Sequence, residues 1–159
     1  METYQVGLIG LAFFMVLALL AFSSWRRRIS KQQLTLPKPI WVSGSTNGFK
    51  CLYVATTFAD RPLERVVGHG LAHRGEAYLL ITASGLEVTR TGEVSFLIPK
   101  KDLIEVGAVS AVIDRAVEKD GLVSIKWKLG SQELESHFRF VDANLRSRSL
   151  SELSSLVGA

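Results

Sequence analysis

The sequence is poor in the residues that build several common kinds of site. Of its 159 residues one is cysteine, four are proline and three are histidine. The lone Cys51 excludes a disulfide framework, a CxxC redox pair and a thiolate cage for a metal. Lys50 beside it would favour the thiolate, but we expect a buried and unreactive thiol. A GxSxG motif, a phosphate-binding loop and a recognisable pair of catalytic carboxylates are also missing. We therefore expect neither an enzyme nor a bound cofactor.

One short stretch of the chain has no acidic residues, and the excess positive charge lies there. The chain carries +4 with an isoelectric point near 9.4, values that raise the question of nucleic acid. Residues 26–49 hold five basic residues and no acidic one, whereas residues 50–159 hold 14 basic and 14 acidic residues. A charge-neutral domain lacks the broad basic surface that nucleic acid requires. We therefore expect no nucleic-acid partner.

Charge is absent altogether from residues 3–25, whose apolar core is VGLIGLAFFMVLALLAF at Val6–Phe22. As a helix the 17 core residues span about 26 Å and the longer run a little over 30 Å, close to the hydrocarbon thickness of a bilayer. A cleaved signal peptide would carry basic residues before its apolar core, whereas here they follow it. A core helix of a soluble protein would be amphipathic, and this run is apolar all round. The pattern predicts a transmembrane anchor at residues 1–25.

The residues after the apolar run predict its orientation. Trp25 suits the headgroup layer as an interfacial anchor, and basic residues stay on the cytoplasmic side. We expect a single-pass protein of the plasma membrane, with the N-terminus outside and the C-terminal domain in the cytoplasm. The membrane-proximal basic cluster consists of Arg26, Arg27, Arg28 and Lys31. We interpret it as a topology signal, and recognition of anionic lipid headgroups is the alternative.

Residues 26–49 are expected to form a basic juxtamembrane segment followed by a linker rich in Pro, Gly and Ser. Pro37 and Pro39 exclude a continuous helix from the membrane into the next domain. As flexible coil, about 20 such residues span roughly 25 Å. The sequence therefore predicts a tether that keeps the domain near the membrane without fusing it to the anchor. It leaves open whether Trp41 packs on the domain or touches the membrane interface.

Residues 50–159 change to short alternating apolar segments with glycine at most turns. The pattern predicts about seven antiparallel strands. These lie near residues 52–58, 77–82, 86–90, 94–98, 103–112, 122–129 and 133–140. Residues 118–121 are expected to form a hairpin turn.

Three of these strands carry detailed expectations. In the first, Leu52, Val54, Thr56 and Phe58 are predicted to share one face. In the last two, apolar residues alternate with polar ones. These apolar residues are Val123, Ile125, Trp127 and Leu129 in one strand, and Leu134, Phe138 and Phe140 in the other. Lys126 and Lys128 would lie opposite Glu133 and Glu135. His137 falls on the polar face and is expected to be solvated.

The end of the chain changes period. After Asp142, a predicted N-cap, leucines recur at helical spacing, which indicates an amphipathic helix that ends near Gly158. The predicted fold is mainly β: an N-terminal transmembrane helix, then a barrel of about seven antiparallel strands with a C-terminal helix. This is the outline of a pleckstrin-homology-like (PH-like) barrel in residues 50–159.

Three stretches sharpen this outline: Tyr53–Gly75, Ser84–Val106 and Glu118–Arg139. Together they resemble the PH-like domain of small single-pass membrane proteins of actinobacteria, which are often labelled PH-like domain, membrane or transporter proteins. TTFADRPLERV is the most specific element. The resemblance implies a PH-type barrel on the cytoplasmic side of a bacterial plasma membrane, and it implies no established activity. Transport by this chain alone is not expected, because a single span cannot enclose a solute path.

The connection after the first predicted strand holds Asp60, Arg61, Glu64 and Arg65. Eukaryotic PH domains often carry inositol-phosphate-binding basic residues at this place. Here two acids alternate with two bases, so an internal salt-bridge network is favoured over a phosphate site. Further positive charge would come from other residues if the fold brings them close. The candidate ligand- or partner-binding residues are Arg61, Arg65, Arg74, Lys100 and Lys101.

His69 and His73 have the spacing of a zinc-binding helix. The glycines around them disfavour a helix, and no third ligand is in sight, so no metal is expected. Trp127, Phe138 and Phe140 are interpreted as core aromatics and not as a base-stacking platform, because no basic excess accompanies them.

The sequence therefore predicts a membrane-anchored, non-enzymatic PH-like module for binding or scaffolding at the cytoplasmic face of the plasma membrane. The lipid bilayer surrounds its anchor, and we expect a protein partner rather than a lipid ligand for its domain. The alternative is an accessory subunit of a membrane transport or export complex, in which the apolar span itself makes the contacts.

Overall fold

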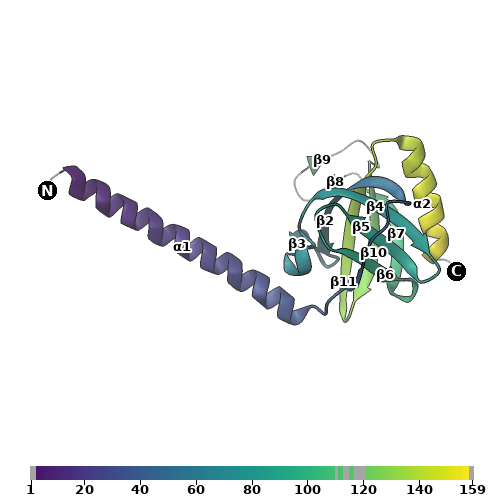
Figure 1. The fold of residues 1–159 in the computed structure, drawn as a ribbon, viewed down its shortest axis with the longest axis horizontal. Helices are drawn as coiled ribbons and strands as arrows, with labels where there is room; N and C mark the ends of the chain where they lie inside the picture. Colours follow the sequence, from purple (N-terminus) through teal and green to yellow (C-terminus); the bar gives the residue numbers. More distant parts are fainter. Residues whose placement is uncertain (1–2, 110, 113–114, 117–120, 158–159) are drawn as a thin grey trace.

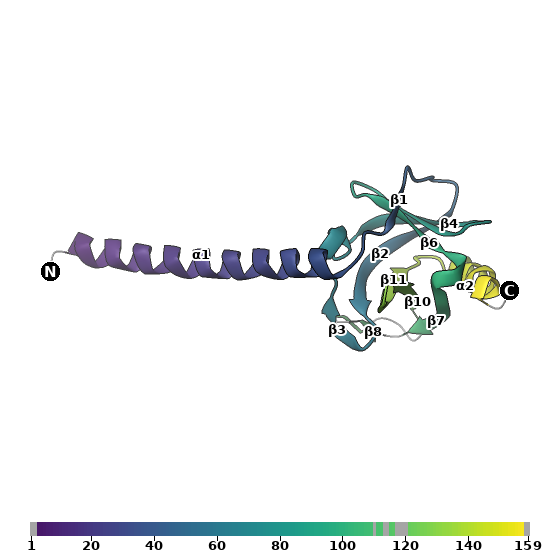
Figure 2. The same cartoon turned by 90° about the horizontal axis from the view of Figure 1, so that it is seen from below.

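The computed structural model describes residues 3–109, 111–112, 115–116 and 121–157. One long helix projects from a strongly curled β-sheet, and a second helix packs on the side of the sheet away from the first (Figures 1 and 2). The two helices therefore mark two opposite ends of the folded domain. The end that receives the long helix is called the near end below, and the end that carries the C-terminal helix is called the far end.

The elements follow one another in the order α1 (Thr3–Thr35), β1 (Ile40–Val42), β2 (Phe49–Phe58), β3 (Arg61–Arg65), η1 (Gly68–Gly70), β4 (Gly75–Thr82), β5 (Gly85–Arg90), β6 (Ser95–Pro99), η2 (Lys100–Asp102), β7 (Leu103–Val109), β8 (Ala111–Val112), β9 (Arg115–Ala116), β10 (Leu122–Leu129), β11 (Gln132–Arg139) and α2 (Ala143–Val157). The main sheet runs β1-β6-β5-β4-β2-β11-β10-β7, and β3 pairs with β2. Its described neighbours are all antiparallel.

Seven of the nine strands in this sheet match the predicted ones: β2, β4, β5, β6, β7, β10 and β11. The predicted mainly-β fold with an N-terminal apolar helix and a C-terminal helix is thus confirmed. The short strands β1 and β3 were not predicted, because they lie in segments that were interpreted as linker and connection. The predicted turn at residues 118–121 falls mostly outside the described residues, as does the predicted helix end at Gly158.

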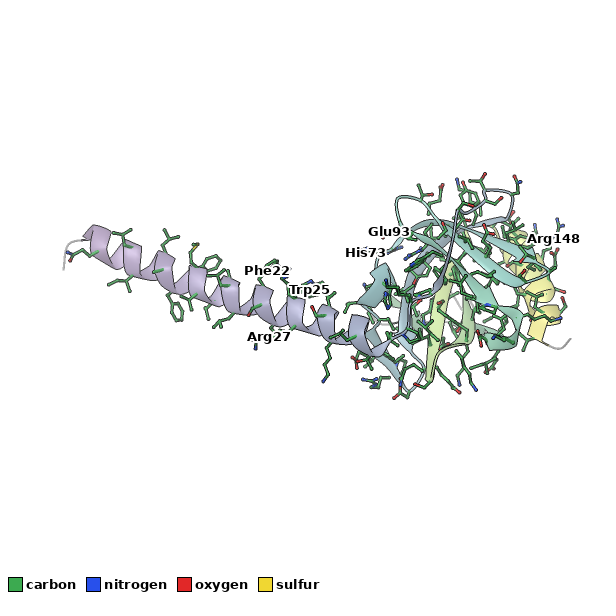
Figure 3. All side chains as sticks on the ribbon, turned by 60° about the horizontal axis from the view of Figure 1, so that its bottom comes forward. Phe22, Trp25, Arg27, His73, Glu93 and Arg148 are labelled. Carbon is green, nitrogen blue, oxygen red and sulfur yellow. The ribbon has the colours of Figure 1, made fainter. Side chains whose placement is uncertain are left out.

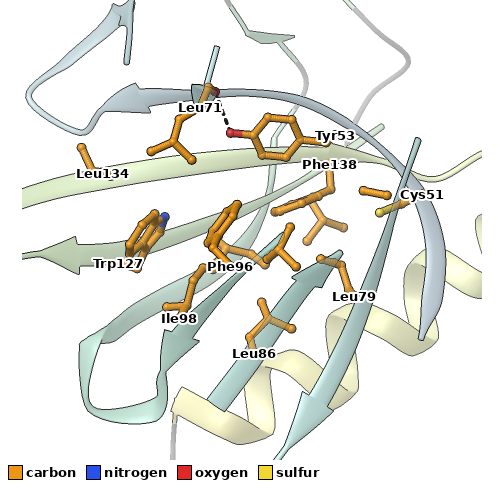
Figure 4. Packing of buried hydrophobic residues seen from close by; sticks show 14 of the residues in the cluster. Cys51, Tyr53, Leu71, Leu79, Leu86, Phe96, Ile98, Trp127, Leu134 and Phe138 are labelled. Carbon is orange, nitrogen blue, oxygen red and sulfur yellow. Dashed lines mark hydrogen bonds between the residues drawn. The ribbon is translucent and has the colours of Figure 1, made fainter. Parts of the chain in front are cut away.

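The core fills the concave side of the curled sheet. Tyr53, Phe96, Trp127 and Phe138 are its largest members, and each is at most 1% exposed (Figure 4). Phe96 and Trp127 stack with ring centroids 5.8 Å apart. Burying each such side chain contributes about 1.5–3 kcal/mol, so these aromatics add substantially to the stability of the barrel. The prediction that these aromatics belong to the core is confirmed.

A chain of hydrogen bonds crosses this core and reaches the loop that contains η1. The Tyr53 hydroxyl donates to the carbonyl of Leu71 at 2.7 Å and lies 2.6 Å from Thr56 Oγ1. Thr56 Oγ1 in turn lies 2.6 Å from Ser136 Oγ, which accepts from Trp127 Nε1 at 3.0 Å. Burial raises the pKa of Tyr53 to about 12, so its hydroxyl remains a donor. These bonds hold the η1 loop against the sheet.

The strand β2 changes face part way along. Its register against β11 shifts by one residue at Val54. Before the shift Tyr53 lies in the core while Leu52 is only half-buried, and after it Thr56 and Phe58 are buried. The prediction that Leu52 and Val54 share an inward face with Phe58 is therefore wrong, because a β-bulge moves the alternation by one position.

The last hairpin has the predicted register, with Lys126 opposite Glu135 and Lys128 opposite Glu133. Lys126 Nζ also forms a diagonal ion pair with Glu133 Oε2 at 3.1 Å. His137 departs from the prediction, because it is 3% exposed. The outer face of the sheet is covered at this end of the hairpin, so burial lowers the pKa of His137 below its usual value.

The helix α2 begins as predicted. The backbone N–H of Asn144 donates to Asp142 Oδ1 at 2.8 Å, the geometry of an N-cap. Leu153 is buried, and Leu145, Leu150 and Leu156 pack against the same core. The helix lies along β7. On β2, burial in the core raises the pKa of the Cys51 thiol to about 12, in agreement with the predicted unreactive thiol.

Candidate functional site

The apolar side chains of α1 are exposed, so packing within the chain does not account for this helix. Its segment Gly7–Gln32 is long and apolar enough to cross a membrane, and the most apolar 18-residue stretch within it has no buried residue. All 33 residues of α1 span about 50 Å, which exceeds the hydrocarbon layer by about 20 Å. A helix placed with Trp25 in the headgroup layer therefore continues for about three turns beyond it.

The prediction that a flexible tether follows the membrane anchor is wrong. The helix continues through the basic cluster and ends at Thr35, because no helix breaker occurs before Pro37. Leu36 is then 3% exposed in the core, and Ile40–Val42 pairs with β6. Trp41, whose placement was left open, packs in a T-shaped arrangement with the His69 ring, with the ring centroids 6.3 Å apart. The division of the chain at residues 25 and 49 stays a prediction.

One glutamine attaches α1 to the barrel. Gln32 Oε1 accepts hydrogen bonds from the backbone N–H groups of Val67 at 2.7 Å and Gly68 at 3.1 Å. These amides lie at the start of the 3₁₀ turn η1, where backbone donors have no partner within the turn. A single side chain from the helix thus satisfies two backbone groups of the domain.

His69 makes the next contact of this junction. Its Nε2 lies 3.0 Å from the carbonyl oxygen of Leu36, and since a carbonyl only accepts, Nε2 carries the proton. His69 adopts φ 56°, the one positive φ at a described residue other than glycine. Such a backbone conformation costs about 1 kcal/mol or more, and the contacts with Leu36 and Trp41 offset it.

The turn between β10 and β11 closes the junction from the other side. Gly130 has φ 63°, and a Cβ at this position would lie 2.8 Å from Pro37 Cγ. The proline therefore packs on the bare backbone of the turn. Gln32, Leu36, Pro37 and His69 together fix the angle at which α1 leaves the barrel.

A cavity of about 340 Å³ lies beside this junction and is called the junction pocket. Its lining comes from α1 and the residue after it, from the β2–β3 hairpin and from β11: Lys31, Gln32, Thr35, Leu36, Phe58, Arg61, Glu64 and Gln132. Arg61 Nη1 donates to Glu64 Oε2 at 2.7 Å, and Arg61 Nε lies 3.3 Å from Asp60 Oδ2. The guanidinium also sits 4.5 Å from the centroid of the Phe58 ring. The predicted salt-bridge network is thus confirmed around Arg61.

Among the candidate residues, the pocket brings together only Lys31 and Arg61. Trp25 and Arg27 are exposed on α1 (Figure 3). Arg26 is also exposed, and the side chain of Arg28 lies outside the described residues. Arg65 lies on β3. Arg74, Lys100 and Lys101 are exposed and do not line the pocket. Sequence reasoning missed Gln32 altogether, because a glutamine in a polar stretch gives no signal of its tertiary contact.

The pair His69 and His73 is separated by the turn. His73 Nδ1 lies 2.8 Å from Glu93 Oε1 at the near end (Figure 3), while His69 faces Leu36. Among the residues that the structure describes, no three His, Cys, Asp or Glu side chains are placed to hold a metal ion.

A second cavity, of about 500 Å³, opens at the far end between α2 and the strands β2 and β4. We call it the far groove. Its lining consists of Asn47, Gly48, Phe49, Lys50, Leu79, Leu80, Ile81, Leu145, Arg148 and Glu152. The floor is mostly apolar, whereas Arg148 and Glu152 form an exposed ion pair of 3.0 Å on its rim. No motif in the sequence indicated this groove, because its walls come from three separate segments.

The curled antiparallel sheet with a helix packed at one end defines the fold class as a PH-like domain. A family profile described as Bacterial PH domain-like matches residues 30–154. The chain therefore belongs to the bacterial PH domain-like family. The matched residues begin inside α1 and so include the junction. Comparison with curated proteins found no match. PH-like domains in general bind or scaffold and do not catalyse.

Proposed function

We propose that the protein is a membrane-anchored, non-enzymatic PH-like module that binds or scaffolds a protein partner at the cytoplasmic face of the plasma membrane. The observation that carries the proposal is the junction. An apolar helix of membrane length leaves the barrel at an angle fixed by Gln32 and Leu36, so insertion of α1 would also orient the domain.

The orientation rests on the basic residues that follow the apolar run. Arg26, Arg27, Arg28 and Lys31 lie between the span and the barrel, and the positive-inside rule places such residues in the cytoplasm. The N-terminus then lies outside and the barrel inside, as the resemblance to actinobacterial single-pass membrane proteins also implies. A reporter fused after residue 159 tests this, since alkaline phosphatase would be inactive there and a fluorescent protein that folds only in the cytoplasm would be active.

The far groove is the surface that we assign to the partner. Because α2 and α1 lie at opposite ends, the groove faces away from the membrane when α1 is inserted (Figures 1 and 2). Its half-buried Phe49, Leu80 and Leu145 form an apolar floor beneath a charged rim. An apolar centre with a polar rim is the usual composition of a protein interface.

Site-specific photocrosslinking in cells tests this assignment. A crosslinker at Glu152, on the rim, should yield a discrete adduct that Leu80→Glu abolishes. The matched control is Val94→Glu, an exposed position in the β5–β6 turn, which should leave the adduct intact. Equal loss in both variants, or no adduct at any rim position, would contradict the assignment.

The fully exposed apolar surface of α1 favours a second candidate function, an accessory subunit of a transport or export complex that makes contact through the span. Replacing Val6–Phe22 with an unrelated membrane helix of equal length separates the two. The binding module should keep the Glu152 adduct after the exchange, whereas a subunit held by its span should lose its complex.

A further inference from the structure

The strand β4 extends beyond its partner β2 at the far groove. Phe49, the first residue of β2, pairs with Leu79, and β4 continues for three further residues. The loop before Phe49 does not extend this pairing but crosses the outer face of the sheet, where the N–H of Ser45 donates to Thr89 Oγ1 at 2.8 Å. Gly48 then lies so close to β4 that a Cβ there would overlap the carbonyl of Leu79. The end of β4 therefore has an open edge on the side of the groove.

Ile81 directs its backbone hydrogen-bonding groups toward this open edge. The N–H of Thr91 donates to the carbonyl of Glu76 at 2.9 Å, so Glu76 and every second residue after it bond to β5. The residues between them, Ile81 included, direct their backbone groups to the opposite side. Among the described residues, no group accepts from the Ile81 N–H or donates to its carbonyl. A free donor and acceptor on a strand edge form a template for another strand.

The walls of the far groove fit an extended segment. One wall is the open edge of β4 and the other is α2, which contributes Leu145 and Arg148. An extended segment between them would turn every second side chain toward the apolar floor at Phe49 and Ile81, and the others toward solvent. A helix in the same place would use its backbone groups internally and leave Ile81 unpaired. The groove therefore favours a partner that binds as a strand.

The end of the groove at the β4–β5 turn is positively charged. The N–H of Lys100 donates to the carbonyl of Ser84 in this turn at 3.0 Å, so η2 lies beside the end of β4. Lys100 and Lys101 are exposed, and neither forms an ion pair with a described residue. The half-buried Asp102 supplies one negative charge against these two. The rim ions of the groove pair with one another, so the unmatched charge lies at η2 and is complementary to acidic residues of a partner.

We propose that the partner enters the far groove as an extended segment of alternating apolar and polar residues, which pairs with β4 at Ile81 and places acidic residues beside η2. The segment runs antiparallel to β4, in line with β2, so its acidic residues precede its apolar ones. This inference rests on the proposed assignment of the far groove to a protein partner. It gives that partner a chemical description and a direction of binding.

A labelled synthetic peptide, EETVTVT, tests the proposal by fluorescence anisotropy with the full chain in nanodiscs. It should bind more tightly than the reversed peptide TVTVTEE, which has the same composition. N-methylation of one valine should weaken binding about fivefold, the usual loss for one hydrogen bond, because one N–H of the segment faces Ile81. N-methylation of the residues on either side should change nothing, since their N–H groups point away from β4. Equal affinities across the methylated peptides, or no binding of EETVTVT, would overturn the proposal.

Two substitutions at Ile81 isolate its backbone donor. Ile81→Ala and Ile81→Pro both remove much of a side chain that packs against the core, but only proline also removes the N–H. The pairing with β5 does not use this N–H, so a proline is compatible with the strand. Ile81→Pro should bind the peptide about fivefold more weakly than Ile81→Ala. Equal affinities of the two variants would contradict strand pairing, and the methylated peptides keep the test decisive if Ile81→Pro does not fold.

The charge at η2 has a separate test. The double variant Lys100→Gln with Lys101→Gln should weaken EETVTVT and leave the uncharged peptide QQTVTVT unaffected. The matched control Lys128→Gln removes an exposed lysine on β10 and should change neither affinity. An equal loss for both peptides would contradict the assignment of acidic residues to this end.

Hydrogen exchange provides a readout at the edge itself. In the free chain the amide of Ile81 should exchange faster than those of Leu80 and Thr82, which bond to β5, and the peptide should slow it. The crosslink from Glu152 separates this inference from the proposed function. Absence of that adduct contradicts the proposed function. An adduct that Ile81→Pro and Ile81→Ala retain equally overturns only the strand pairing.

Discussion

The near and far ends of the barrel are built on opposite principles. At the near end, polar contacts join the helix to the barrel: Gln32 accepts hydrogen bonds from two backbone N–H groups, and His69 donates to the carbonyl of Leu36. At the far end, an apolar floor is left half-covered under a rim of exposed ion pairs. The near end thus fixes the position of an element, whereas the far end offers surface. Changes at the near end should cost stability, and changes at the far end should cost binding.

The largest effect is expected from Leu36→Ala. Removing a buried leucine side chain from a core costs about 2–5 kcal/mol, so thermal unfolding of the full chain in detergent should shift down by many degrees. The control is Leu34→Ala, two residues earlier and 88% exposed, which should change the unfolding free energy by less than about 0.5 kcal/mol. Equal shifts of the unfolding temperature in the two variants would show that the junction is a flexible linker.

A smaller loss is expected from Gln32→Ala. It leaves two backbone donors near Val67 without their acceptor and should cost about 1–3 kcal/mol. Hydrogen exchange should show the loss at the amides of Val67 and Gly68 before the rest of the barrel. Gln32→Glu keeps the accepting oxygen and should restore protection, while the exposed Ser30→Ala serves as the neutral control. Unchanged hydrogen exchange in Gln32→Ala would show that Gln32 does not hold α1 on the barrel.

The pH dependence tests whether the two ends share one cooperative unit. Burial lowers the pKa of His137 in the folded chain. As the pH falls, the unfolded chain therefore takes up a proton at His137 at a higher pH than the folded chain does. Stability should therefore be fully present above the unfolded value of about 6.5 and fall as the pH drops below it. Urea midpoints at pH 7.5 and 5.5, followed at near-end and far-end amides, should decrease together. His137→Gln should flatten this dependence and the exposed His73→Gln should not, so a reversed order would contradict the assignment.

The smallest effect is expected at the rim of the far groove. Lys50 and Glu76 form an ion pair of 2.8 Å, which lowers the pKa of Glu76 and raises that of Lys50. Both groups are exposed, so Glu76→Gln should leave the unfolding temperature nearly unchanged. As the pH falls through the lowered pKa of Glu76, the pair should be lost without unfolding. A marked loss of stability would show that the far end also has a structural role.

Local pattern was sufficient for the elements that the chain builds from neighbouring residues. Alternation predicted the strand Leu122–Leu129 with Trp127 inward, and Asp142 predicted the start of α2. The same logic failed at Val54, where a bulge reverses the alternation. It failed again at His137, whose polar position in the pattern gave no sign that the outer face is covered there.

The candidate site was only half predictable for a related reason. Arg61 and its acidic neighbours are adjacent in sequence, so their ion pairs could be foreseen. Lys31 and Arg61 are 30 positions apart and line the same cavity only because Gln32 and Leu36 dock α1 on the barrel. No property of either residue encodes that docking, because it depends on backbone amides that are free only in the folded turn.

The sequence by itself determined the apolar helix, the basic cluster behind it, the neutral charge of the domain and the β-rich fold class, since each follows from composition and short-range periodicity. The tertiary structure decided that the helix is docked on the barrel and not joined to it by a flexible linker. It alone placed the two cavities. The physical reason is that a helix continues until something breaks it. Whether its last turns are solvated or docked depends on partners that lie more than 30 residues away along the chain.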